Sequence, residues 1–469
     1  MRRPYLVLAI CCMSLFIVGL DATIMNIALP ALREDLGASI SGLQWTIDAY
    51  TLVLASLLVL SGSTADRIGR RRIFQTGLVL FSAGSLLCSV APSLGWLIAF
   101  RAVQAIGGSM LNPVAMSIIT NTFTDPRERA RAIGVWGGVV GFSMAVGPLL
   151  GGFLVDTLGW RSIFWINVPV GIAAVVLAAK FIPESRAPHP RRLDPVGQVL
   201  VFLVLAGVTY GIIEGPTAGW SSPRIIGCFL VGAAALAALL AYEPRQAEPL
   251  LQLRFFRSVP FSGATLIAVC AFASLAGFLF LNSIYLQEVR GLTPLHAGLW
   301  TLPMAAMTVI FAPISGRLVG SRGTRLPLTL AGLGFIAGLL PLTRLTADTP
   351  VWQLMACYVL FGFGFAMVNS PITNTAVSGM PREQAGVAAA IASTSRQVGG
   401  ALGVAVIGAA VAAKSTGFAE ASRTGWWIMT GLGAAVLVLG LVTTGRWARS
   451  TTERAAVPTD EPVTARMAR

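Results

Sequence analysis

Long apolar stretches separated by short polar connections make up almost the whole of this sequence. A helix needs about twenty mostly apolar residues to span a bilayer, and stretches of this length recur throughout. They predict fourteen transmembrane helices, at residues 5–27, 43–61, 73–91, 94–119, 133–155, 163–182, 196–213, 225–242, 261–286, 297–318, 326–345, 351–375, 387–413 and 426–442. We therefore expect an all-α polytopic membrane protein.

The basic residues concentrate in alternate connections between these stretches. Four arginines lie within residues 67–72, directly after the second stretch, and three more lie within residues 127–131, after the fourth. Basic connections are preferentially retained in the cytoplasm. With an even number of spans, this asymmetry predicts that both termini are cytoplasmic and that the chain is a multi-pass protein of the plasma membrane.

Composition excludes several other classes of protein. The chain is 55% hydrophobic and 12% charged, about half the charged fraction of a soluble domain. Its net charge of +14 does not indicate nucleic acid, because the basic clusters lie between apolar stretches without interleaved aromatic residues. The six cysteines lie in apolar stretches and the two histidines lie at or beside connections. We therefore expect no metal site, no cofactor and no enzymatic activity.

Short motifs recur between the two halves of the chain. The sequence ITNT at 119–122 returns at 372–375, and PRE at 126–128 returns at 381–383. Both pairs are separated by roughly 250 residues, which is the pattern of two homologous six-helix halves expected of a transporter. The separation exceeds one half by about two spans, so the seventh and eighth helices are expected to be an insertion.

This repeat predicts four segments. Residues 1–186 form a six-helix bundle, 187–255 a linker with two additional transmembrane helices, 256–447 a second six-helix bundle, and 448–469 a cytoplasmic tail expected to be disordered.

The connection after the second stretch, residues 62–72, reads GSTADRIGRRR. Gly62 and Gly69 allow two helix ends to approach closely, and the aspartate is placed to cap the helix that follows. An ordinary basic loop is the alternative interpretation. The pattern resembles the loop between the second and third helices of the major facilitator superfamily, with Thr64 where leucine is usual. The resemblance implies a conformational gate formed by Gly62, Asp66, Arg67, Gly69 and Arg70, in which we expect Asp66 to pair with the other half of the protein.

The first stretch contains a carboxylate at Asp21. An acidic residue near the bilayer centre costs about 2.5–3.5 kcal/mol on insertion scales, so it indicates a function unless a neighbouring helix holds it for stability. Burial disfavours the ionised form, which suits a reversible proton carrier. Residues 20–30, LDATIMNIALP, resemble a motif of the drug:proton antiporter branch with fourteen helices.

The fourth stretch places Arg101 at a depth similar to that of Asp21, so the two side chains are expected to face each other. The resemblance extends to Gln104 and the following glycines, although Ala105 and Ile106 depart from the family pattern. We interpret Asp21 and Arg101 as the proton-coupling pair. A purely structural hydrogen-bond network is the alternative.

The fifth stretch is rich in glycine. Its GPLLGG sequence, with Gly147, Pro148, Gly151 and Gly152, resembles a hallmark of the proton antiporters in this superfamily and implies an inter-domain hinge. Close packing of small residues is the alternative.

Other polar residues inside the apolar stretches are weaker candidates for lining a substrate cavity. They are Asn26, Asp48, Tyr50, Gln104, Asn112, Asn369, Asn374 and Arg396. Asp48 is also an alternative coupling carboxylate, whereas Glu214, at the end of the seventh stretch, is expected to lie in water.

Together, these resemblances imply a secondary active transporter that exports amphipathic or cationic organic compounds in exchange for protons by alternating access. Its partners are then a small organic substrate, protons and the lipid bilayer, and we expect a monomer to suffice. Proton-coupled transport of a specific metabolite or lipid-like molecule is an alternative, and a membrane receptor or enzyme is a remote one.

Overall fold

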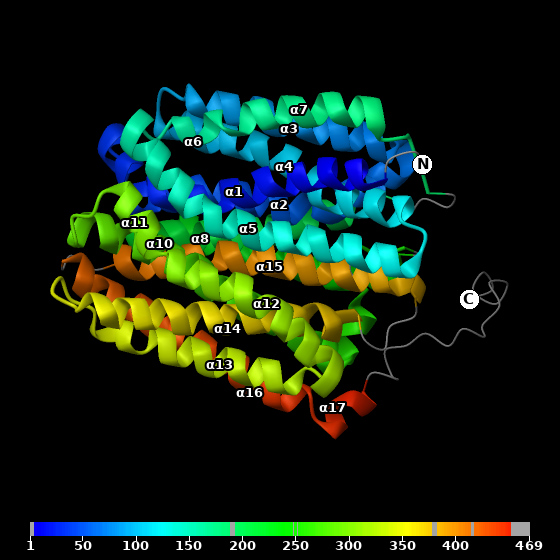
Figure 1. The fold of residues 1–469 in the computed structure, drawn as a ribbon. Helices are drawn as coiled ribbons and strands as arrows, with labels where there is room; N and C mark the ends of the chain where they lie inside the picture. Colours follow the sequence, from blue (N-terminus) through cyan, green and yellow to red (C-terminus); the bar gives the residue numbers. More distant parts are fainter. Residues whose placement is uncertain are drawn as a thin grey trace.

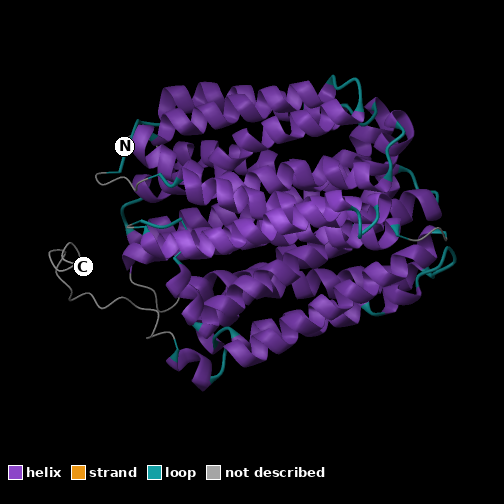
Figure 2. Cartoon of the chain, turned by 180° about the vertical axis from the view of Figure 1, so that it is seen from behind, coloured by secondary structure: helices purple, strands orange, loops and turns teal. Residues whose placement is uncertain are grey.

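A computed structural model describes residues 4–187, 193–246, 248–250, 252–377, 382–413 and 417–451. This part of the chain is helical throughout and contains no strand (Figures 1 and 2). The α-helices are α1 (Pro4–Leu36), α2 (Ile40–Ile68), α3 (Arg70–Ser89), α4 (Leu94–Thr122), α5 (Pro126–Leu158), α6 (Ser162–Trp165), α7 (Asn167–Phe181), α8 (Pro195–Ala218), α9 (Pro223–Tyr242), α10 (Val259–Ile284), α11 (Pro294–Trp300), α12 (Leu302–Arg322), α13 (Arg325–Leu339), α14 (Val351–Val377), α15 (Arg382–Ala412), α16 (Phe418–Thr443) and α17 (Arg446–Ser450). Short 3-10 turns η1, η2 and η4 (Glu243–Arg245, Leu253–Arg257 and Pro341–Arg344) and a π-helical turn η3 (Tyr285–Val289) complete the described elements.

Within these ranges, fourteen helical segments are long and apolar enough to cross a membrane. They correspond one to one to the fourteen predicted stretches, so the predicted multi-pass all-α fold is confirmed. The ends differ, however, because polar residues continue several helices past their apolar part. The first helix, predicted to end at residue 27, runs on to Leu36.

Two of the predicted spans are interrupted. The sixth breaks at Ile166 into α6 and α7, and the tenth breaks at Thr301 into α11 and α12. In each case a proline, Pro169 or Pro303, follows within three residues. Proline has no N–H to donate to the preceding turn, so the helical hydrogen-bond ladder is interrupted there.

The helices are arranged in two groups. Figure 1 shows α1 to α7 in the upper part of the view and α10 to α17 in the lower part. The start of α1 and the helix α17, which are the two termini of the described chain, lie at the same end of the bundle. Helix α8 packs against α9, α2 and α15, so this pair of helices lies at the line where the two groups meet.

The end of the chain contributes to the second group. Thr451, after α17, accepts a hydrogen bond from the N–H of Val259 at 2.9 Å. Most of the predicted tail, residues 452–469, lies outside the described residues.

The hydrogen bonds found between the two groups, within the described part of the chain, lie at the end away from the termini. Arg33 pairs with Glu288 at 2.8 Å, and Ser283 donates to the main-chain oxygen of Asn26 at 2.5 Å. The Nε2 of Gln44, near the start of α2, donates to main-chain oxygens of α15. The molecule is therefore closed at this end, which we call the distal end.

Candidate functional site

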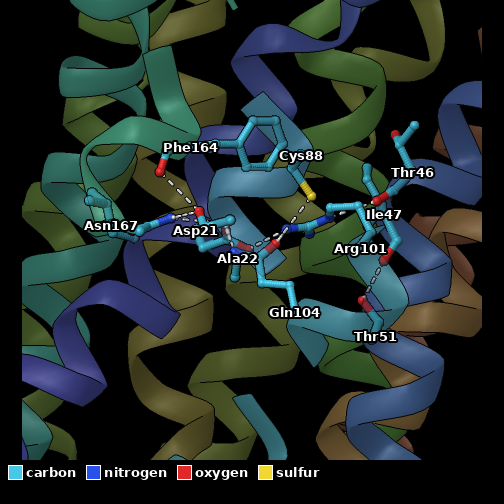
Figure 3. A network of polar contacts seen from close by, with 12 residues as sticks. Asp21, Ala22, Thr46, Ile47, Thr51, Cys88, Arg101, Gln104, Phe164 and Asn167 are labelled. Atoms are coloured by element: carbon cyan, nitrogen blue, oxygen red, sulfur yellow. Dashed lines mark hydrogen bonds and ion pairs between the residues drawn. The ribbon is translucent and has the colours of Figure 1, made fainter. Parts of the chain in front are cut away.

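The carboxylate of Asp21 is the centre of a buried polar network in the first group of helices (Figure 3). Its Oδ2 accepts a hydrogen bond from Nη1 of Arg101 at 2.5 Å. Its Oδ1 accepts from Nε2 of Gln104 at 2.9 Å and from Nδ2 of Asn167 at 3.3 Å. The side chains of Asp21 and Arg101 are each only 1% exposed. The negative charge is thus fully paired and shielded from solvent.

Arg101 is held on its other sides as well. Its Nε donates to the main-chain oxygen of Thr46 at 3.1 Å, and its Nη1 also donates to Oε1 of Gln104 at 2.8 Å. The guanidinium carbon lies 4.3 Å from the centre of the Tyr50 ring, a cation–π contact. Four helices, α1, α2, α4 and α7, therefore meet at one ion pair, and a movement of any of them changes its geometry.

Such a pair responds strongly to the loss of either partner. A buried ion pair adds little net stability, but an unpaired buried charge costs about 3–5 kcal/mol. A proton on Asp21 would remove one of the two charges, so protonation and the packing of these four helices are energetically linked.

Sequence reasoning missed part of this network. Asn167 is fully buried and donates to Ser85 Oγ at 3.1 Å as well as to Asp21, and Ser85 donates to the main-chain oxygen of Phe164 at 2.9 Å. Asn167 is the first residue of α7, directly after the helix break. A lone asparagine inside an apolar span, two residues before a proline, was the available signal.

Comparisons with known proteins identify the family. The profile of the Major Facilitator Superfamily matches residues 11–404. The chain belongs to the Major Facilitator Superfamily. It is 37% identical to the tetracenomycin C resistance and export protein of Streptomyces glaucescens, covering 88% of this chain and 77% of the relative. It is 36% identical to the multidrug resistance protein Stp of Mycobacterium tuberculosis (88% and 76% covered) and 33% identical to the multidrug efflux pump LfrA of Mycolicibacterium smegmatis (87% and 80% covered).

A solved structure supports the assignment of the fold. The crystal structure of a D-xylose-proton symporter superposes with a TM-score of 0.67, covering 93% of this chain and 97% of that one, at 16% sequence identity. At this identity, the likeness establishes the Major Facilitator fold alone.

The loop that resembles the gate of the superfamily joins α2 to α3. Gly69 has a φ of 135°, a conformation that favours glycine, and its N–H donates to Ala65. Asp66 does not cap α3 as predicted, because its carboxylate pairs with Arg70 at 2.9 Å. The N–H of Arg71 instead donates to Oε1 of Glu184 at 3.1 Å, so Glu184 takes the capping role.

No partner for Asp66 from the second group is present among the described residues. The two groups have their hydrogen bonds at the distal end, whereas this loop lies near the termini (Figure 1). The predicted loop is mostly helical, since residues 62–68 belong to α2. Gly62 is half-buried there, and a Cβ at this position would lie 3.7 Å from Pro113, in ordinary contact. Arg67 is exposed.

The glycines of α5 lie in close contacts on two sides. A Cβ at Gly147 would lie 1.9 Å from Thr23 Oγ1, and one at Gly151 would lie 2.5 Å from Ile24 Cγ1, both on α1. A Cβ at Gly152 would lie 2.5 Å from the main-chain oxygen of Pro294 on α11. These glycines therefore allow α5 to approach both groups of helices at once. Pro148 takes part through its main-chain oxygen, which faces Gly298 of α11.

The other predicted cavity residues are dispersed. Tyr50 and Gln104 belong to the Asp21 network, and Asn26 lies nearby with its Nδ2 donating to Ala22 at 3.2 Å. Asn112 is half-buried on α4 and its Oδ1 has no partner. Asp48 is fully buried on α2 without a hydrogen-bond partner.

The remaining candidates belong to the second group. Arg396 donates through Nη2 to Thr373 Oγ1 at 2.5 Å and lies 5.9 Å from the ring centre of Phe272. Asn369 is half-buried and Asn374 is exposed, both on α14. These residues do not join the Asp21 network.

Glu214 was expected to be exposed to water, but its side chain is partly enclosed by protein. It is half-buried near the end of α8, and its Oε1 accepts a hydrogen bond from Nε1 of Trp45 at 2.8 Å. The side chain is held because α8 packs against α2 at this level.

No group of three metal-ligating side chains is present among the described residues.

Proposed function

We propose that this protein exports amphipathic organic compounds from the cytoplasm in exchange for protons, by alternating access. The observation that carries the proposal is the buried pair of Asp21 and Arg101 with its ring of hydrogen-bond donors. A buried carboxylate that is paired with a guanidinium inside a group of transmembrane helices is a typical proton site, because its charge is costly unless it is balanced. The relatives named as resistance, export and efflux proteins support the direction of transport.

The proposed cycle uses the two ends of the bundle. The distal end, which is closed by Arg33, Glu288 and Gln44, is placed on the outside, and the end with the termini faces the cytoplasm. The basic loop after α2 lies at the cytoplasmic end in this orientation. Compounds bind from the cytoplasm, and opening of the distal end together with protonation of Asp21 releases them outside. Asp66 then has a partner in the second group only when the cytoplasmic end closes.

The domain organisation is also a proposal. Residues 1–186 and 256–447 form the transporting bundles, and 187–255 carry the inserted pair α8 and α9. The contacts of α9 with α8, and of α8 with α2 and α15, support a peripheral position. Joining residues 182 and 261 by a flexible linker should leave both bundles folded, as judged by thermal unfolding in detergent.

Transport assays in everted membrane vesicles test the function. The probes are a panel of fluorescent amphipathic dyes of both charge signs, with a pH gradient established beforehand. We expect dye movement to depend on the pH gradient and added dye to dissipate that gradient. The Asp21→Asn variant is the matched control and should do neither. Dye movement that persists after a protonophore has removed the gradient would contradict proton exchange.

A further inference from the structure

Asp48 is a second carboxylate deep in the transport core, and its surroundings differ from those of Asp21. Its side chain is 0% exposed, and neither Oδ1 nor Oδ2 has a hydrogen-bond partner. Asp21, by comparison, accepts three hydrogen bonds, one of them from a guanidinium. The surroundings of Asp21 therefore stabilise an ionised carboxylate, whereas the surroundings of Asp48 do not.

The contacts of α2 place Asp48 at a junction of three helices. Gln44 donates to the main-chain oxygens of Val404 and Ala405 of α15 at 3.0 and 2.8 Å, and a Cβ at Gly400 would lie 3.7 Å from Thr51. Residues 44 and 51 thus face α15. In a helix, residues three and four positions apart share a face, so Asp48 lies on this face between them.

The neighbouring face of α2 is covered by α8. Trp45 donates to Glu214 of α8, and its ring lies 5.8 Å from the ring of Tyr210. About three turns further along α2, Gln198 of α8 donates to the main-chain oxygen of Ser56. Asp48 is three residues after Trp45, so it lies where α2, α8 and α15 come together.

Among the described side chains, no cation at this junction balances a charge on Asp48. On α15, Arg396 is one turn beyond Gly400 and donates to Thr373, and the side chains of Arg382 and Glu383 lie outside the described ones. On α8 and α9, Glu214 is held by Trp45, and Arg224 lies over the Tyr210 ring. On α2 itself, Tyr50 faces Arg101, which is committed to Asp21.

We propose that Asp48 is a second proton-binding residue, distinct from Asp21, and that its protonation is required for α2 and α15 to close against each other at the distal end. An ionised carboxylate without a donor or a counter-ion is too costly to bury, so Asp48 carries a proton in this closed conformation. When the α2–α15 contact opens, water reaches the carboxylate and the proton can leave for solvent. Proton binding and closure therefore favour each other.

This arrangement also gives the inserted helix a function. Helix α8 covers the remaining side of the junction. It therefore excludes water from Asp48 while α2 and α15 are in contact. The inference rests on the proposed proton exchange, because a second proton-binding residue affects transport only if protons drive it. Its test measures conformation without substrate, so that either proposal can fail alone.

The experiment measures the distance between the distal ends of α2 and α15 in the purified full-length protein. Spin labels are attached at Ser41→Cys and Ala413→Cys, in a background in which the six native cysteines are replaced. We expect the short-distance population to grow as the pH is lowered. In the Asp48→Asn variant, which cannot ionise, the short distance should predominate at acidic and alkaline pH alike.

Two further variants separate this effect from others. Asp48→Glu should retain the pH dependence, because it keeps an ionisable carboxyl group at this position. Glu214→Gln, which neutralises the nearby acid of α8, should behave like the parent. If the Asp48→Asn distances follow pH as in the parent, or if the parent distances do not depend on pH, the proposal is wrong.

Thermal unfolding gives an independent readout that does not need the labels. A protonated carboxyl group without partners contributes no hydrogen bonds, so Asp48→Leu, of similar size and fully apolar, should unfold at the same or a higher temperature at neutral pH. A clear loss of thermal stability in Asp48→Leu would mean that the carboxylate is paired, and would overturn the proposal.

Discussion

Arg33, near the end of α1, and Glu288, in the π-helical turn after α10, form an ion pair of 2.8 Å that joins the two groups of helices at the distal end. Both side chains are partly exposed, at 41% and 29%, so solvent screens the attraction, and such pairs contribute about 0–1 kcal/mol. The pair therefore favours the closed distal end without locking it, as reversible opening requires.

We expect Glu288→Gln to shift the conformational equilibrium toward the open distal end, by at most about fivefold, since only one screened ion pair is lost. The label pair at the ends of α2 and α15 measures this shift. The exchanged variant, Arg33→Glu with Glu288→Arg, should restore the parent distribution. An unchanged distribution in Glu288→Gln would show that the pair does not contribute to closure.

Asp21→Asn should uncouple transport. The amide is nearly isosteric and can still accept from Arg101, so we expect folding and compound binding to be retained. Proton release on adding dye to the detergent-solubilised protein should be lost, together with accumulation against a gradient. If Asp21→Asn releases protons like the parent and Asp48→Asn does not, the coupling role belongs to Asp48.

Arg101→Ala should move the pH optimum of transport to higher values. Without the guanidinium, a charge on Asp21 is unbalanced in a buried site, so its neutral form is favoured and more alkaline conditions are needed to remove the proton. The pH profile of dye export measures this effect. The double variant Asp21→Asn, Arg101→Gln removes both charges and should recover much of the thermal stability that Arg101→Ala alone loses.

Asp66→Asn should slow transport and leave the equilibrium binding of dye nearly unchanged. In this conformation the carboxylate pairs with its neighbour Arg70, and it has no ion-pair partner in the second group among the described residues. The pair is partly exposed and of little energetic consequence. Its proposed partner in the second group is reached when the cytoplasmic end closes, so the variant should affect turnover. Normal turnover in Asp66→Asn would refute the gate.

Gly147→Ala should destabilise the protein by about 1–3 kcal/mol, because the added methyl group overlaps Thr23 on α1. Gly134→Ala, on the same helix but with open space at the added Cβ, is the matched control and should be neutral or slightly stabilising. Thermal unfolding measures both. Combining Gly147→Ala with Thr23→Ala removes the overlapping hydroxyl and should recover part of the loss.

Much of this protein could be predicted from the order of its residues. The number of spans follows from the lengths of apolar stretches, because a bilayer has a definite thickness, and these lengths are local properties of the chain. The depths of Asp21 and Arg101 along their helices follow in the same way. Motifs such as residues 20–30 and 62–72 then identified the superfamily.

The tertiary structure decided which side chains meet. Asn167 and Ser85 join Asp21 from helices far away in sequence. Asp66 pairs locally with Arg70, and Asp48 is left without a hydrogen-bond partner among the described residues. The hydropathy of a span gives the depth of a residue but not the rotation of its helix about its own axis. That rotation is set by packing between helices, through contacts such as those of the α5 glycines. It determines whether a buried carboxylate lies next to a cation, as Asp21 does, or has no partner to stabilise its charge.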